Sequence, residues 1–162
     1  MASETQEIIM PLFSGIPQDH ADALRAGASD AYGNTPDRQT SDGTAPCRCC
    51  LALIDEGRDM LVFAHRPFNA PQPYAETGPV FLCADHCDAV AASPDIPTVV
   101  VSPNYLLKGY SEDERLVYGT GRVVPKDQIA SYADALLDRS DIAFVDLRSA
   151  TNNCWQARMH KA

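Results

Sequence analysis

"IAFVDLRSATNNCWQARMH", residues 142–160, predicts a β-hairpin, because two strand-like segments flank the turn-forming residues "SATNN". Alternation along the second segment predicts two faces. One face carries mostly polar side chains, namely Cys154, Gln156, Arg158 and His160. The opposite face carries Trp155, Ala157 and Met159, and we expect this apolar face to meet the core.

The segments before this hairpin contain further helix and strand patterns. Residues 126–138 predict a helix, since Pro125 precedes them and apolar residues recur at helical spacing. Residues 105–124 predict a second hairpin, in which "YLLKGY" and "RLVYGTGRVV" flank "SEDE". Residues 49–66 predict a third, in which "CCLALI" and "MLVFAHR" flank "DEGRD", and the short strand "VFLC" follows at residues 80–83.

The N-terminal part completes the predicted fold. A strand is expected at residues 8–13 and a helix at 18–31, which Pro17 opens. Residues 33–44 contain turn formers and almost no apolar side chain, which predicts a loop. The whole pattern predicts an α+β fold, an antiparallel sheet built from hairpins with two packed helices. With 162 residues and 45% apolar composition, we expect a single domain over residues 1–162.

Charge argues against two classes of partner. The chain carries 13 basic and 22 acidic side chains, a formal net charge of −9, and no segment has a basic stripe. Binding to nucleic acid or to an anionic membrane surface is therefore not expected. No apolar run reaches the roughly 20 residues of a membrane span. The first residues lack the positive charge of a signal peptide, so we expect a cytoplasmic protein with reduced thiols.

Four of the six cysteines form two closely spaced pairs, one in "PCRCC" and one in "CADHC". Zinc is commonly held by four thiolates or imidazoles from two such pairs. The favoured zinc ligands are Cys47, Cys50, Cys83 and Cys87. His86 can replace the last of these, and Cys49 is a spare thiol that can exchange with Cys50. Two alternatives stay open: the thiols pack as small core residues, or a disulfide joins the two groups, which a reducing compartment disfavours.

The motif "HRPF", followed by "PYAETGP", suggests a ligand pocket. Arg66 can clamp a carboxylate or a phosphate with two hydrogen bonds, while Tyr74 and Phe68 form apolar walls. The plainer interpretation is that Arg66 makes a surface ion pair with Glu76 or Asp59.

A thiol nucleophile needs a base within reach. His86 is adjacent to Cys87 in sequence, and Cys154 can instead pair with His65 across the fold. The plainer interpretation is that His65, which shares a strand face with apolar residues, is a hydrogen-bonded core or rim residue.

Several motifs resemble a bacterial family known as domain of unknown function 1203. They are "PCRCCL" at 46–51, "HRPF" at 65–68, "PYAETGPVF" at 73–81, and "NNCWQAR" after the last helix and strand. The resemblance extends from about residue 8 onward. Similar members often have a histidine where this chain has Cys49. The resemblance implies no activity, substrate or cofactor.

Three hypotheses follow from these observations. The first is a binding module for a small molecule or a protein, with a cysteine-rich zinc site. The second is an enzyme whose pocket uses a thiol, a histidine and an arginine. The third is a structural or interaction domain whose cysteines only pack. The sequence leaves the partner and the oligomeric state open.

Overall fold

Residues 11–162 are described by the computed structural model, so residues 8–10 of the predicted N-terminal strand lie outside the described residues. The described chain forms two α-helices and eight strands in two antiparallel sheets, which confirms the α+β class. The elements are β1 (Leu12–Ser14), α1 (Gln18–Arg25), β2 (Asp37–Thr40), β3 (Asp59–His65), β4 (Gly78–Cys83), β5 (Asn104–Tyr110), β6 (Arg122–Pro125), α2 (Ile129–Leu137), β7 (Phe144–Ser149) and β8 (Trp155–His160).

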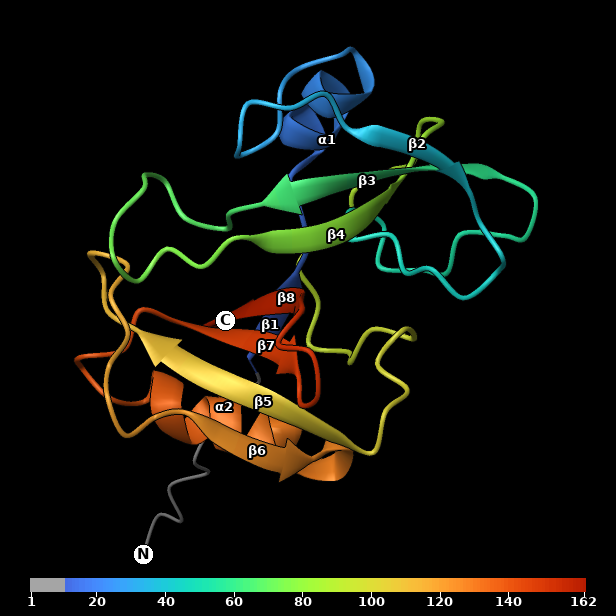
Figure 1. Cartoon of the computed structure of the whole chain (residues 1–162). Coiled ribbons are helices and arrows are strands. Elements are labelled where there is room, and N and C mark those ends of the chain that lie inside the picture. Colours follow the sequence, from blue (N-terminus) through green and yellow to red (C-terminus); the bar gives the residue numbers. More distant parts are fainter. Residues whose placement is uncertain (1–10) are drawn as a thin grey trace, which may run out of the picture.

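The two sheets lie one above the other. One has five strands in the order β1-β8-β7-β5-β6, and the other has three in the order β2-β3-β4. In Figure 1 the three-stranded sheet lies above the five-stranded sheet, with α1 at the top of the molecule and α2 behind β5 and β6. The described chain enters the five-stranded sheet with β1, crosses to the three-stranded sheet, and returns after β4.

The C-terminal half of the sequence prediction is confirmed. β5 pairs with β6, and β7 pairs with β8, as antiparallel hairpins. The helix predicted at residues 126–138 forms as a 3₁₀ turn, Lys126–Gln128, that continues into α2. The strand predicted from "VFLC" is the greater part of β4.

The hairpin predicted at residues 49–66 is wrong. Residues 47–51 form a turn, in which the Leu51 amide donates to the Cys47 carbonyl at 2.9 Å and Leu51 has a φ of 52°. The Arg48 amide donates to the Phe81 carbonyl at 2.9 Å, which fixes this turn to β4. β3 pairs instead with β2 on one side and with β4 on the other.

Two N-terminal boundaries also differ from the prediction. Residues 33–44 contain β2, whose four residues are all exposed, so its sequence lacks the apolar alternation of a strand. The helix predicted at 18–31 ends at Arg25. Gly27, with a φ of 101°, adopts the left-handed conformation that ends many helices.

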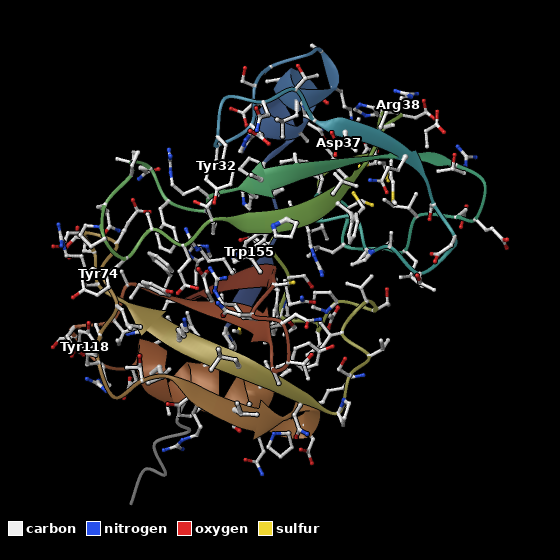
Figure 2. All side chains as sticks on the ribbon, viewed as in Figure 1. Tyr32, Asp37, Arg38, Tyr74, Tyr118 and Trp155 are labelled. Carbon is white, nitrogen blue, oxygen red and sulfur yellow. The ribbon has the colours of Figure 1, made fainter. Side chains whose placement is uncertain are left out.

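A β-bulge corrects the predicted faces of the last strand. Leu147 pairs with Ala157, but Arg148 pairs with Trp155, so Gln156 is an extra residue in β8. The bulge reverses the side on which Trp155 lies, and it joins the core of the three-stranded sheet instead of the core that contains Met159. Figure 2 shows Trp155 between the two sheets. Gln156, predicted on a polar face, is also buried.

The described residues form three apolar clusters. One lies between α2 and the five-stranded sheet and includes Leu107, Val145 and Leu147, none of which has exposed surface. A second combines the three-stranded sheet with α1 and the turn at 47–51. Phe68, Tyr110 and Phe144 form a third, smaller cluster. Among residues 11–162 no helix is both long and apolar enough to cross a membrane. The single domain over residues 1–162 stays a prediction.

Candidate metal centre

The four cysteines predicted as zinc ligands lie together. The sulfur atoms of Cys47, Cys50, Cys83 and Cys87 are all within 4.8 Å of one another. The Cys47 and Cys87 sulfurs are 3.7 Å apart, although 40 residues separate them in sequence. Sulfur atoms are visible in Figure 2 beside the end of β4. This cluster, which we call the tetrathiol site, can hold a metal ion.

Backbone hydrogen bonds bring the two pairs together. The turn at 47–51 presents Cys47 and Cys50 on one side, and an isolated parallel bridge pairs Cys47 with Phe81 of β4. Cys83 is the last residue of that strand, so its sulfur reaches the same place. The chain after Cys83 is then folded back by Gln18 of α1.

Gln18 holds the second pair through two hydrogen bonds. Its side-chain nitrogen donates to the Cys87 carbonyl at 3.0 Å, and its side-chain oxygen accepts from the Ala89 amide at 2.7 Å. Arg25, about two helical turns after Gln18 on the same side of α1, donates from Nε to the Cys83 carbonyl at 2.9 Å. Both ends of the segment that carries Cys83 and Cys87 are therefore fixed to the same helix.

Donors also point at the sulfurs themselves. Arg25 Nη2 lies 2.8 Å from the Cys87 sulfur, and the Cys83 amide donates to the Cys47 sulfur at 3.4 Å. Hydrogen bonds from the Cys50 and Cys83 thiols lower the pKa of Cys47 well below its usual value. The same bonds to Cys47 raise the pKa of Cys83 and raise that of Cys50 to about 11. The site thus favours a negative charge on Cys47, and it holds a cation, Arg25, beside the Cys87 sulfur.

Two other side chains that the sequence offered as ligands stay outside the tetrathiol site. His86 is largely exposed and binds Asp88 at 2.9 Å, so the structure favours Cys87 over His86. Cys49 is fully buried, and burial raises the pKa of its thiol to about 12. All six cysteines are free thiols, so the structure contains no disulfide between the two groups.

Arg66 and Tyr74 lie in different surroundings. Arg66 lines a cavity together with Phe68, and its Nε donates to the Phe68 carbonyl at 3.4 Å. The Tyr74 hydroxyl instead accepts a hydrogen bond from Tyr118 at 3.1 Å, and Figure 2 shows the two side chains next to each other. That Arg66 and Tyr74 bind a cofactor stays a prediction.

The suggested ion pairs of Arg66 do not form. Glu76 binds Lys108 at 2.6 Å and lies 3.4 Å from Arg148. Asp59 pairs with Arg38 at 3.0 Å. Both carboxylates are therefore already occupied by other cations.

His65 is buried, as the plainer interpretation expected, but its Nδ1 has no hydrogen-bond partner among residues 11–162. Its ring lies between those of His20 and Trp155, at centroid distances of 5.6 and 5.1 Å. His65 and Cys154 both line a smaller cavity of about 200 Å³. No hydrogen bond joins them within the described chain, and the enzyme hypothesis stays a prediction.

Sequence reasoning missed Gln18 and Arg25, because one polar residue on a short helix carries no spacing signal. It also missed Arg148, which is buried at 4% exposure in a strand where alternation alone was visible.

Comparison with known proteins supports the resemblance in the sequence. A family model described as "Protein of unknown function (DUF1203)" matches residues 44–161, a range that includes the whole tetrathiol site. No curated protein and no solved structure matches the chain.

Proposed function

Because the chain belongs to the DUF1203 family of proteins of unknown function, we propose a function from its own geometry. The protein is a binding module whose fold is held by one zinc ion on Cys47, Cys50, Cys83 and Cys87. The convergence of these four sulfurs within 4.8 Å carries the proposal.

The sulfur positions fit a tetrahedral site. With zinc–sulfur bonds of about 2.3 Å, the sulfurs of a tetrahedral site lie about 3.8 Å apart. The distance between the Cys47 and Cys87 sulfurs is 3.7 Å, and no pair exceeds 4.8 Å.

The donor set indicates a structural role for the metal. Four cysteines fill all four positions of a tetrahedral zinc ion, whereas catalytic zinc sites keep one position for water or substrate. Four thiolates around a divalent ion leave a net negative charge, which Arg25 at 2.8 Å from the Cys87 sulfur partly offsets. Soft thiolate ligands select zinc or iron over magnesium or calcium.

The metal would reinforce the link between parts of the chain that hydrogen bonds already bring together. It would tie the turn at 47–51 and the end of β4 to the segment 84–103, which contains no helix or strand. Metal binding at such a site contributes directly to folding free energy, because the unfolded chain has no formed site.

Elemental analysis of the purified protein tests the proposal. We expect one zinc per chain in the wild type and loss of zinc in the Cys47→Ser/Cys50→Ser variant. Cys154→Ser is the matched control, since this half-buried cysteine lies outside the tetrathiol site, and it should keep its zinc. Cys49→Ser should also keep zinc, which would show that Cys49 is the spare thiol.

Three outcomes would contradict the proposal. A wild-type protein that holds no metal after expression with added zinc, and that unfolds at the same temperature with and without a chelator, would favour cysteines that only pack. Iron in place of zinc, visible by the colour of iron–thiolate bonds, would change the identity of the metal. Zinc that persists in the double variant would place the metal elsewhere.

A further inference from the structure

A second site lies at the opposite end of the three-stranded sheet. In the β3–β4 register, Cys83 pairs with Met60 at one end and Gly78 pairs with His65 at the other. Next to His65 is a cavity of about 430 Å³ between the β1–α1 connection, the segment after β3, and β8. We call it the basic cavity, and its titratable lining residues are His20, His65, Arg66, Arg158 and His160.

The basic cavity contrasts with the rest of the molecule. The chain has a net charge of −9, yet no aspartate or glutamate lines this cavity. Two carboxylates outside the cavity interact with single lining residues. Asp146 is bound to Arg158 at 2.7 and 3.0 Å. Burial lowers the pKa of His20, and the negative charge of Asp19 opposes that shift.

Arg66 is the cation of this cavity that has no counter-ion. It makes no ion pair within residues 11–162, and its only hydrogen bond is the one from Nε to the Phe68 carbonyl. The remaining guanidinium nitrogens are therefore available to a ligand. A guanidinium presents paired donors that match the oxygens of a carboxylate or a phosphate.

Two buried nitrogens in the cavity wall also lack partners. His65 Nδ1 and Trp155 Nε1 have no hydrogen-bond partner among the described residues, and the two side chains are only 6% and 5% exposed. Buried polar atoms are nearly always hydrogen-bonded in folded proteins, so two unpaired nitrogens are unusual. Both side chains also line the smaller cavity that contains Cys154, and the two nitrogens themselves are shielded from solvent. Burial, together with the positive charges of His20, Arg158, Arg148 and Arg66, lowers the pKa of His65 to about 3.

Much of the remaining wall is apolar. Phe68 and the indole of Trp155 line the cavity together with Pro67, and Ser14 and Asn69 add uncharged polar groups. Ligand cavities commonly combine such apolar walls with a few polar groups that fix the orientation of the ligand.

From these contacts we propose that the basic cavity binds a small organic anion, a carboxylate or phosphate carried on a flat apolar group. Arg66 binds the charged oxygens, and the apolar group lies between Phe68 and the Trp155 ring. This site is separate from the tetrathiol site, and neither proposal depends on the other.

The fluorescence of Trp155 provides the test, because it is the only tryptophan in the chain. Benzoate and phenyl phosphate carry the two candidate charged groups on the same ring, and benzamide is the uncharged control of similar shape. We expect a saturable fluorescence change with at least one anion, and binding of benzamide at least tenfold weaker. A response to benzoate alone identifies a carboxylate site, and a response to phenyl phosphate alone identifies a phosphate site.

The variant Arg66→Gln should weaken the binding of the preferred anion at least tenfold. Arg38→Gln, which alters an exposed arginine of the same sheet outside the cavity, should leave the binding unchanged. No saturation by either anion at millimolar concentration would overturn the proposal, as would equal binding of benzamide or unchanged binding by a folded Arg66→Gln variant. If that variant does not fold, the comparison of anion with benzamide on the wild type decides alone.

Discussion

His65 is a residue whose protonation the fold opposes. Its pKa is lowered to about 3, mainly by burial, from an ordinary value of 6.5. The imidazole is therefore neutral in the folded protein at pH 7, and the unfolded chain binds the proton more tightly. The free energy of unfolding must then fall as the pH drops below 6.5 toward 3, since protonation pulls the equilibrium toward the unfolded state.

This contribution can be isolated with a variant. Removing the titration of His65 in His65→Gln should make the pH dependence of the unfolding free energy shallower between pH 6.5 and 4, by up to about 1.4 kcal/mol per pH unit. Urea denaturation at four pH values measures the difference. If the unfolding free energy of His65→Gln depends on pH as steeply as that of the wild type, protonation of His65 does not cause the loss of stability in acid.

The strands differ in how much of them the sequence could show. β5 and β7 bury alternate side chains in the core that α2 covers, so their apolar pattern was sufficient to place them. β2 has four exposed residues and is a strand only because β3 offers it an edge. "CCLALI" has the composition of a strand, but hydrogen bonds within 47–51 fold it into the turn that carries Cys47 and Cys50.

The tetrathiol site could be predicted because the spacing within each of its two cysteine pairs is short and is visible in the sequence. The basic cavity was predicted only in part, through Arg66 and Phe68, because its other walls come from two distant segments, 14–20 and 155–160. The position of Trp155 depended on a bulge, and an extra residue in one strand leaves no mark on an alternating pattern.

The segment between β4 and β5 should depend on the metal more than any other element. Its early amides bind neighbours of the tetrathiol site: Ala89 donates to Gln18 and Val90 to the Cys49 carbonyl. Removing zinc with a chelator should therefore speed hydrogen exchange of residues 84–98 at least tenfold. The amides of β7 and β8 in the same sample serve as the internal control and should keep their protection.

Hydrogen exchange measured by mass spectrometry resolves these segments. The Cys47→Ser/Cys50→Ser variant without chelator should show the same pattern as the chelated wild type. Uniform acceleration across β7 and β8 would instead mean that the metal supports the whole fold, and no acceleration at 84–98 would mean that hydrogen bonds to α1 are sufficient to hold the segment.

Across the whole molecule, the two sheets meet through polar contacts as well as apolar ones. Arg158 on β8 binds Asp146 on β7 through two nitrogens and also donates to the Pro67 carbonyl, in the segment that follows β3. Its guanidinium lies 3.8 Å from the centre of the Phe144 ring. Glu76, from the same β3–β4 connection, reaches Lys108 and Arg148 on the five-stranded sheet. Ion pairs thus link the β3–β4 connection to the larger sheet.

Asp146 is the most deeply buried charge in this interface, with no exposed surface. Asp146→Asn would leave the Arg158 cation, whose side chain is 17% exposed, without its counter-charge. We expect the free energy of unfolding to fall by about 3 kcal/mol, because breaking one half of a buried pair leaves an uncompensated charge. Asp141→Asn, which breaks an exposed pair with Arg139, should lower the free energy of unfolding far less, because solvent screens an exposed pair. Urea denaturation of each variant measures both changes. Replacing the pair together, in Asp146→Leu/Arg158→Met, should recover most of the loss, and a double variant as unstable as Asp146→Asn would show that the carboxylate matters for its geometry and not for its charge.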